Sequence, residues 1–418
     1  MVGSMRPFKL QMQMQSIRAP APRWPGVPAF PTSSARLLGL PIPQARRQSS
    51  TTPASTRRET MMDAVVLHLS DRGTPNTLKF ERFPLPARPA PGYARVELSA
   101  VALNKRDHWI ALNQYPALAD RTVLGSDGVG TLVVVSSPRG TGSVGAAHPL
   151  LDKRVLILPS VSWGPAGKRA QGKDFRVLGN QPDNGTFAQY VDVPTENVFP
   201  APRALGDAEA AALPLAGLTA WRAVKTRGGV ERGMNVLVTA AGSGVSTFAM
   251  QYAVALGAKV WTTSSSRAKI DFAMEKLGVE GGVDYRDEDW TGKLAELVGE
   301  EGAGERVMDV VVDSSGMVEQ CLKLLRPGGR YVFFGNTTQR AHTLTPADMR
   351  AVYFLQLQIV GSTMGSPEEF AEMLQFVQEH GVKPVVHSVR KFSKEGWEEA
   401  LREMEMGEQQ GKIVLTME

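Results

Sequence analysis

The chain has 418 residues, of which 42% are hydrophobic and 21% charged, a composition ordinary for a globular protein. This length exceeds what one hydrophobic core usually serves, so we expect two domains and some additional chain. The single cysteine, Cys321, excludes an internal disulfide framework and a clustered-thiolate zinc site, and it favours a reducing compartment. No apolar run approaches the roughly 20 residues that cross a bilayer, so no membrane span is predicted.

The net charge of +5 comes from the N-terminal end of the chain. Residues 1–58 contain eight arginines, one lysine and no acidic residue, which leaves a charge of −4 on the remainder. A mildly acidic body without a basic stripe argues against binding to nucleic acid.

Residues 1–60 form an Arg/Pro/Ser-rich leader that we expect to be disordered. Its composition is that of a mitochondrial transit peptide, which predicts the mitochondrial matrix as the location. Its prolines leave little room for a long amphipathic helix, although residues 5–18 could form a short one. Alternatively, translation starts at Met61 or Met62 and the protein is cytoplasmic.

From Met62 the chain alternates short strands with turn residues, which predicts a β-rich, barrel-like domain. The expected strands are DAVVLHL (63–69), TLKFERFPL (77–85), YARVELSAVAL (93–103), GVGTLVVVSS (128–137), KRVLILPS (153–160) and FAQYVDVP (187–194).

From about Asp207 helices and strands alternate, which predicts a parallel sheet with helices on both faces. The expected order is helix 207–225, strand 234–240, helix 245–257, strand 258–264, helix 267–278, strand 306–315, helix 317–329 and strand 330–335. After Thr345 the elements are mixed, and we expect the last strand, KIVLTM (412–417), to rejoin the first domain.

The strongest chemical signal is NVLVTAAGSGVSTFAMQYAVALGAKV (235–260), in which a buried strand leads through a glycine turn into a helix. Glycines at such a turn let a pyrophosphate approach the backbone, and the free amides of the helix start attract negative charge. A strict G-x-G-x-x-G pattern would place glycine at Thr247, and an ordinary strand-to-helix turn is the alternative. The order of the elements favours a dinucleotide, with Ala241, Gly242, Ser243, Gly244 and Val245 as cofactor-binding residues.

Ser264 stands about where an NAD-binding site usually carries an acid for the ribose. The hydroxyls and cations that follow would suit a 2′-phosphate, so we expect NADPH. The residues assigned to this role are Ser264, Ser265, Arg267, Lys269 and Tyr285. The alternative is that Arg267 and Lys269 only solvate the start of a helix.

Several further motifs, taken together, resemble the medium-chain dehydrogenase/reductase superfamily on its quinone oxidoreductase and enoyl reductase side. They are LNKRDHWIALNQYP (103–116), VLGSDGVGTLV (123–133), GTFAQYVDVP (185–194), LPLAGLTAW (213–221), LRPGGRYVFFG (325–335), IVGSTMG (359–365) and GKIVL (411–415), and they lie within residues 61–418. The resemblance implies an α/β fold: a GroES-like β-rich catalytic domain formed by residues 61–200 and 346–418, and a Rossmann doubly wound parallel-sheet domain formed by residues 201–345.

The chain departs from zinc-dependent members of that superfamily at the metal ligands. It has Asn104 where they carry a catalytic cysteine, and Gly125, Ser126 and Asp127 where they carry Gly-His-Glu. The four cysteines of their structural zinc lobe are also missing, and the six histidines show no pair at metal-ligand spacing. We therefore expect no metal.

The resemblance implies an NADPH-dependent, zinc-independent enzyme that transfers hydride to a quinone or an activated C=C bond, such as an enone or enoyl thioester. Tyr115 is then the candidate proton donor, although it could simply line the cleft wall. Asn104 would orient substrate or carboxamide, and Ser126 would donate a hydrogen bond. The resemblance also implies cofactor-lining roles for Thr219, Gly335, Asn336, Ser362, Thr363 and Lys412.

A small-molecule substrate and a homodimer are the expected partners, because members of the superfamily often pair their Rossmann sheets edge to edge. Two other functions stay open. The chain could bind NADPH as a sensor with little turnover, or it could be a zinc-type alcohol dehydrogenase, which the missing ligands disfavour.

Overall fold

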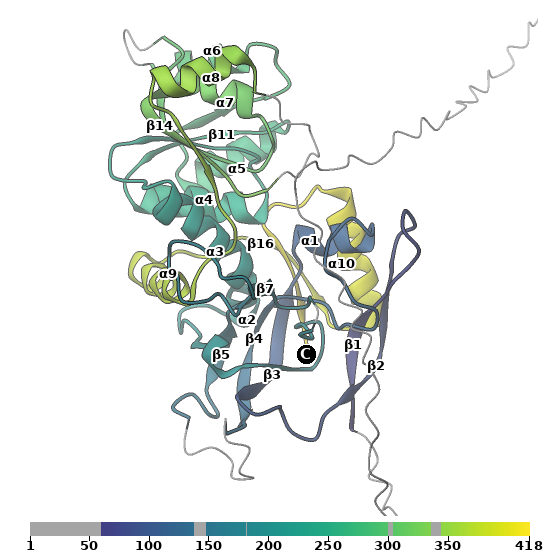
Figure 1. Cartoon of the computed structure of the whole chain (residues 1–418). Helices are drawn as coiled ribbons and strands as arrows, with labels where there is room; N and C mark the ends of the chain where they lie inside the picture. The colour runs from purple at the N-terminus through teal and green to yellow at the C-terminus, as the bar shows by residue number, and fades with distance from the viewer. Residues whose placement is uncertain (1–59, 138–147, 181, 300–303, 336–343) are drawn as a thin grey trace, which may run out of the picture. The chain divides into compact units, whose positions relative to one another are not determined.

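A computed structural model describes residues 60–137, 148–180, 182–299, 304–335 and 344–418 (Figure 1). The predicted leader, apart from Thr60, lies outside these residues, and so does Asn336. No helix in the described ranges is both long and apolar enough to cross a membrane.

A seven-stranded sheet carries the β-rich part of the chain. Its strand order is β16-β17-β3-β4-β5-β9, and β8 also pairs with β3. The bounds are β3 (Tyr93–Ala102), β4 (Asp127–Val135), β5 (Arg154–Ile157), β8 (Tyr190–Pro194), β9 (Val198–Pro200), β16 (Val386–Lys391) and β17 (Lys412–Thr416). All of its neighbours are antiparallel except β16 and β17. The last strand of the chain therefore lies beside β3, with Val414 opposite Ala102.

Smaller elements surround this sheet. They are the hairpin β1 (Thr60–His68) and β2 (Thr77–Leu85), the pair β6 (Ser160–Val161) and β7 (Arg176–Val177), the short 3₁₀ helix η1 (Thr195–Asn197), and the helices α1 (Lys105–Ala111) and α10 (Lys394–Met406). Trp397 of α10 packs on Phe187, with ring centroids 5.2 Å apart, inside the hydrophobic core of this part.

A six-stranded sheet, parallel throughout, follows in the order β12-β11-β10-β13-β14-β15. Its strands are β10 (Asn235–Val238), β11 (Lys259–Thr263), β12 (Gly281–Val283), β13 (Met308–Asp313), β14 (Leu325–Phe333) and β15 (Gln358–Gly361). Counted from β10, this is the strand order of doubly wound dinucleotide-binding folds.

Helices cover both faces of the parallel sheet, as Figure 1 shows for α4 and α5 on one side and α6, α7 and α8 on the other. Side chains alternate along β10, so Val236 and Val238 pack with Phe248 of α4, while Leu237 packs with Leu322 of α7. These helices are α4 (Gly244–Ala255), α5 (Arg267–Leu277), α6 (Trp290–Val298), α7 (Val318–Leu324) and α8 (Pro346–Phe354). The predicted α/β fold class is confirmed.

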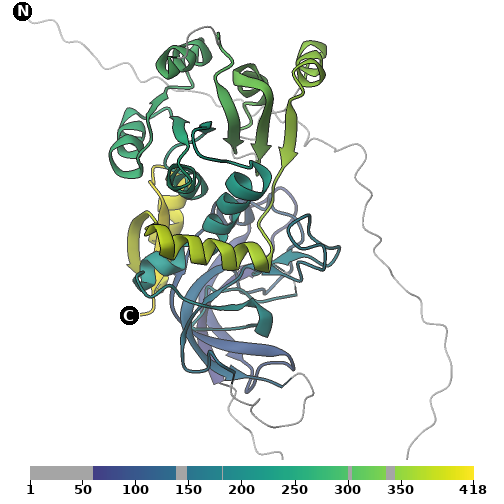
Figure 2. The same cartoon turned by 90° about the vertical axis from the view of Figure 1, so that its left-hand side faces the viewer.

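The segment predicted as one helix over 207–225 is instead three consecutive pieces. Helix α2 (Asp207–Ala212) ends before Pro214, which starts α3 (Pro214–Trp221), because proline lacks the amide hydrogen that a continuous helix needs. The π-helix η2 (Arg222–Arg227) follows directly. Figure 2 shows α9 (Pro367–His380) in yellow-green, and it packs on α3 where the rings of Trp221 and Phe376 lie 4.8 Å apart.

The parallel sheet extends beyond residue 345, the boundary predicted from the sequence. Helix α8 and strand β15 follow that position, and β15 pairs with β14 through Tyr331 and Ile359. Strand β15 was not predicted from the sequence because it is an edge strand. Its residues are mostly exposed, and it lacks the apolar run of a central strand. Two short elements, β12 and α6, were also not predicted.

Candidate functional site

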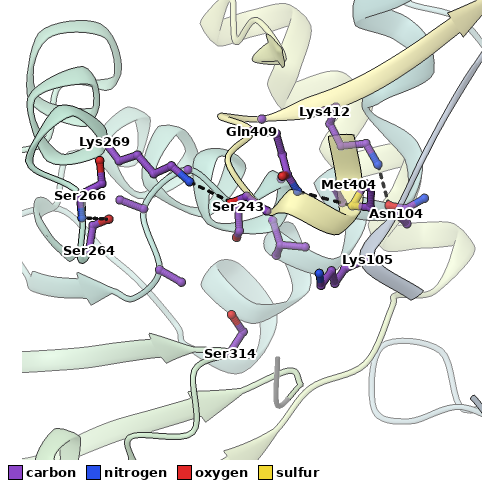
Figure 3. Close-up of a pocket in the computed structure, with 18 of the residues that line it drawn as sticks. Asn104, Lys105, Ser243, Ser264, Ser266, Lys269, Ser314, Met404, Gln409 and Lys412 are labelled. Carbon is purple, nitrogen blue, oxygen red and sulfur yellow. Dashed lines mark hydrogen bonds between the residues drawn. The ribbon is translucent and has the colours of Figure 1, made fainter. Parts of the chain in front are cut away.

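A cavity of about 380 Å³ lies at the carboxyl ends of β10 and β11, where ligands bind in open parallel sheets (Figure 3). The glycine turn after β10 forms one wall, together with the segment after β11. Asn104 and Lys412, which belong to the β-rich part, form another. Of the predicted site residues, those that line this cavity are Asn104, Ala241, Gly242, Ser243, Gly244, Val245, Ser264, Ser265, Lys269, Tyr285 and Lys412.

The glycine turn is closely packed against two lysines. Gly242 has φ +95°, and a Cβ there would lie 2.8 Å from Lys269 Cδ. A Cβ on Gly244 would lie 2.9 Å from Lys412 Cδ. The positive φ therefore favours glycine at Gly242, whereas a Cβ at either position would displace a lysine side chain that lines the cavity.

Helix α4 begins at this turn and directs its first amides toward the cavity. Ser243 caps the helix, and its Oγ accepts a hydrogen bond from the amide of Ser246 at 3.1 Å. A twelve-residue helix with its N-terminus at a cavity favours a negatively charged ligand.

The segment after β11 contributes three serines and one lysine to the cavity. Ser264 is buried and its Oγ accepts from the amide of Ser266 at 3.1 Å, while Ser265 is exposed. Lys269 Nζ donates to the carbonyl of Gly407 at 3.3 Å, and burial lowers the pKa of this lysine. Arg267 does not line the cavity, since its guanidinium pairs with Asp271 one helical turn away at 2.8 Å.

A buried network within the β-rich part forms the other wall. Lys412 Nζ donates to Asn104 Oδ1 at 2.6 Å and to Asp127 Oδ2 at 2.9 Å, and Asn104 Nδ2 donates to the same Asp127 oxygen at 2.9 Å. The other Asp127 oxygen accepts from the amide of Leu215 at 2.7 Å. Asn104 is thus held in one orientation, and its amide nitrogen keeps a second hydrogen available.

Asp107 supports this network from the first turn of α1. Its Oδ2 accepts from the amide of Asn104 at 2.8 Å, and its Oδ1 has no partner among the described residues. Burial raises the pKa of Asp107 to about 6, against the opposing effect of the Arg106 charge.

Ser126 is not available as a hydrogen-bond donor, which corrects our prediction for this residue. It is fully buried, and its Oγ donates to the carbonyl of Leu178 at 2.8 Å and accepts from Arg106 Nη1. Arg106 also donates to Asn180 Oδ1. These contacts cannot be predicted from the sequence pattern, because Leu178 and Asn180 are far from Ser126 and Arg106 along the chain.

Tyr115 lies outside the cavity lining. Its ring is half-buried against the core of the β-rich part, and the Arg106 guanidinium lies 5.0 Å from the ring centroid. Thr219 Oγ1 donates within its own helix to the carbonyl of Leu215 at 2.7 Å. Thr219 and Gly335 do not line the cavity either.

Ser362 and Thr363 line a separate cavity of about 300 Å³. Asn336 lies outside the described residues.

Other residues at the main cavity were not predicted. One of them is Lys105, at the start of α1. Most of the others come from loops that the tertiary structure brings together, and they include Ala240, Ser314, Phe334, Gln409 and Gly411. Gly411 donates its amide to the carbonyl of Gly242 at 2.9 Å. Of these residues, Ser314 could have been predicted from the sequence, because it directly follows strand β13. The carboxyl ends of parallel strands lie at one edge of the sheet, so Ser314 lies at the same edge as the glycine turn.

Among the described residues, no group of three or more His, Cys, Asp or Glu side chains is placed to hold a metal ion. In this chain, Asn104, Ser126 and Asp127 stand at the positions of the zinc ligands, and each of them bonds to a cationic side chain. Lys412 bonds to Asn104 and Asp127, and Arg106 bonds to Ser126.

Two family models match the chain. The alcohol dehydrogenase GroES-like domain matches residues 90–203, and the zinc-binding dehydrogenase domain matches residues 244–379. The first contains the antiparallel core of the β-rich part, and the second contains most of the parallel sheet.

Whole-length relatives agree with these matches. The chain is 34% identical to the zinc-type alcohol dehydrogenase-like protein YogA of Leptosphaeria maculans, across 79% of this chain and 93% of that protein. It is 29% identical to a zinc-type alcohol dehydrogenase-like protein of Schizosaccharomyces pombe, across 82% of this chain and 95% of that protein.

Solved structures show the same fold. A crystal structure described as an NAD-dependent alcohol dehydrogenase is 36% identical and superimposes with a TM-score of 0.73, covering 85% of this chain and 100% of the other. A crotonyl-CoA carboxylase/reductase in complex with NADP superimposes with a TM-score of 0.72, covering 85% of this chain and 95% of the other; at 21% identity it shows the fold alone. With its GroES-like and Rossmann-type parts, the chain belongs to the medium-chain dehydrogenase/reductase superfamily of nicotinamide-dependent oxidoreductases.

Proposed function

We propose that this chain is an NADPH-dependent, zinc-independent reductase that transfers hydride to a quinone or to an activated C=C bond. The observation that carries the proposal is the network of Lys412, Asn104 and Asp127, in which an ammonium group bonds to two of the side chains at the zinc-ligand positions.

These positions do not fit a catalytic zinc ion. Such ions take thiolate, imidazole or carboxylate ligands, whereas Asn104 and Ser126 offer an amide and a hydroxyl. Asp127 is the one anionic side chain, and both of its oxygens already accept hydrogen bonds. A divalent cation would also be repelled by the nearby charges of Lys412 and Arg106.

The main cavity fits a nicotinamide dinucleotide. The glycine turn and the start of α4 would hold the pyrophosphate, since backbone amides and small residues meet there. Ser264, Ser265 and Lys269 would hold the adenosine ribose and its 2′-phosphate, because no carboxylate is among the described residues that line this cavity. The half-buried Lys269 supports NADPH as the preferred cofactor.

The bound dinucleotide would supply hydride to the β-carbon of an enone or to a quinone ring. The chain's own residues would orient the acceptor and stabilise the developing negative charge on its oxygen. Asn104 supports this role, because Lys412 and Asp127 fix its amide while one hydrogen on Nδ2 has no acceptor among the described residues.

Tyr115 is the proposed proton donor to the enolate or its equivalent. Its ring lies 5.0 Å from the guanidinium of Arg106, which also bonds to Ser126 at one of the zinc-ligand positions.

A homodimer is proposed through the free edge of the parallel sheet. Strand β15 pairs only with β14 within the described sheet, and Ile359 on it is exposed. Tyr353 and Phe354 at the end of α8 are 65% and 79% exposed, and they extend the apolar surface beside that edge. Sedimentation of the wild type and an Ile359→Lys variant would show a dimer and a monomer, respectively; a wild-type monomer would refute the pairing.

The function is tested by following the absorbance of NADPH against quinones, enones, enoyl thioesters and simple aldehydes in parallel. Turnover with one of the first three, unaffected by strong chelators, is the expected result. Tight NADPH binding without oxidation by any acceptor would instead favour a sensor. Loss of aldehyde reduction after chelation would indicate a zinc-type alcohol dehydrogenase.

A further inference from the structure

The second cavity, of about 300 Å³, is built around three arginines. Arg222 and Arg227 come from the π-helix η2, and Arg169 comes from the long loop before β7. Ser362 and Thr363, directly after β15, form another side. No acidic residue is among the described residues that line it.

The π-helix explains why Arg222 and Arg227 face the same cavity. In such a helix each turn closes between residues five apart, as in the bond from the amide of Gly228 to the carbonyl of Ala223 at 2.9 Å. Arg222 and Arg227 are five residues apart, so both point to the same side. In an α-helix this spacing would direct them to different faces.

Arg222 has a structural role that positions Arg169. It is 97% buried, its charge is balanced by Glu369 at 2.6 Å, and its guanidinium lies 5.1 Å from the Trp163 ring centroid. It also donates to the backbone carbonyls of Lys168 and Arg169, at 3.0 and 3.2 Å. The loop that carries Arg169 is therefore fixed at the cavity, while Arg222 Nε has no partner among the described residues.

The charges of Arg169 and Arg227 are not balanced by a carboxylate within the described residues. Arg227 Nε donates to the carbonyl of Gly361 at 3.0 Å, which anchors the guanidinium beside Ser362. No carboxylate in the described part of the chain pairs with Arg227 or Arg169. The Ser362 hydroxyl oxygen is buried and has no partner among these residues.

We propose that this cavity binds a carboxylate or phosphate group, with Arg169 and Arg227 as its cationic ligands and Ser362 as a hydroxyl donor. Two guanidinium groups beside an unpaired hydroxyl suit an oxyanion that accepts several charge-assisted hydrogen bonds. We favour the electron acceptor as the source of this group, because the cavity wall leads toward the proposed reaction site. Thr363 is followed by Met364, whose sulfur lies 3.8 Å from Thr219 Oγ1. Thr219 belongs to α3, the helix that starts beside Asp127. This choice of source rests on the proposed reductase function, whereas anion binding does not.

The kinetic test compares an enone that bears a carboxylate with the methyl ester of the same enone. Arg169→Gln and Arg227→Gln are each expected to lower kcat/KM for the carboxylate about tenfold, the effect of losing one charged hydrogen bond, and to leave the ester unchanged. Lys225→Gln is the matched control, because Lys225 is an exposed cation of the same π-helix that does not line this cavity. Equal losses for both acceptors in the arginine variants would refute the acceptor as the source.

A binding test decides the cavity independently of turnover. Calorimetric titration of the full chain, saturated with NADPH, with inorganic phosphate or succinate is expected to give heat in the wild type and in Lys225→Gln, and none in Arg169→Gln/Arg227→Gln. If anions bind but the arginine substitutions change kcat/KM equally for the two enones, the cavity binds a free anion rather than the acceptor. The assignment of the cavity as an anion site then holds. Absence of both anion binding and acceptor discrimination would overturn the proposal, and absence of turnover alone would refute only the reductase function.

Discussion

The ammonium group of Lys412 lies 2.6 Å from the amide oxygen of Asn104, although the two residues are 308 positions apart in the chain. The same ammonium group pairs with Asp127 at 2.9 Å, and side-chain exposure at this pair is 3% and 0%. A buried cation and carboxylate depend strongly on each other, because removing one leaves the other unpaired in a medium of low polarity.

Lys412→Met is therefore expected to lower the free energy of unfolding by about 3 kcal/mol, through the unpaired charge of Asp127. Urea denaturation at neutral pH measures this. Lys391→Met, at an exposed lysine of β16, is the control and should change stability little. Adding Asp127→Asn to Lys412→Met should restore part of the loss, and a double variant less stable than Lys412→Met would contradict the charge-pair explanation.

The carboxyl of Asp107 should make stability depend on pH. Burial raises its pKa from 3.8 to about 6, so between these values the folded state holds a proton that the unfolded state has lost. The stabilisation is full below about pH 4 and declines as pH rises toward 6. It amounts to about 3 kcal/mol, at roughly 1.4 kcal/mol for each unit of pKa.

Asp107→Asn removes this titration and keeps an acceptor for the Asn104 amide. Relative to wild type, the variant should gain stability as pH rises from 4 to 7, as measured by urea denaturation across that range. The exposed Asp174→Asn is the control. Parallel pH profiles for wild type and Asp107→Asn would show that the Asp107 pKa is not raised.

The conformation of the glycine turn can be separated from its role at the cavity. Gly242 and Gly233 both have positive φ, +95° and +83°, but a Cβ meets Lys269 only at Gly242 and meets nothing within 4 Å at Gly233. Alanine at either position should destabilise the fold by about 1 kcal/mol because of backbone strain. Only Gly242→Ala should also raise the Kd for NADPH, by about tenfold, measured by the fluorescence of the bound dinucleotide. An unchanged Kd would remove the glycine turn from the cofactor site.

Lys269→Gln tests the preference for NADPH. If Lys269 bonds to the 2′-phosphate, the substitution should reduce the ratio of kcat/KM for NADPH over NADH about tenfold, mainly through KM for NADPH. Arg267→Gln serves as the comparison, because its guanidinium pairs with Asp271 outside the cavity. A larger loss in Arg267→Gln than in Lys269→Gln would reverse the assignment.

Tyr115→Phe should lower kcat for an enone about a hundredfold while the Kd for NADPH stays constant, because only the phenolic proton is removed. Tyr190→Phe is a matched control, since that hydroxyl bonds to Glu97 on the β-rich sheet at 2.8 Å. Full turnover in Tyr115→Phe would show that Tyr115 is not the proton donor.

Several features could be predicted because they follow from local patterns. Strand β2 spans Thr77–Leu85, as the short run between turn residues predicted, and β10 leads through Gly242 into α4 as the buried strand and glycines predicted. The break at Pro214 was not predicted, because the alanine-rich pattern around this proline continues on both sides of it and resembles a single helix. Strand β15 was missed because an exposed edge strand shows no run of buried residues.

The sequence by itself determined the two kinds of sheet, the glycine turn and the absence of zinc-type side chains at Asn104 and Ser126, since periodicity and residue chemistry are local properties. Only the tertiary structure decided which side chains share a hydrogen bond. It turned Ser126 toward Leu178, joined Lys412 to Asn104, and brought Arg169 to the arginines of the π-helix. These contacts depend on strand pairing and loop paths between distant segments, and spacing along the chain carries no information about the distances they create.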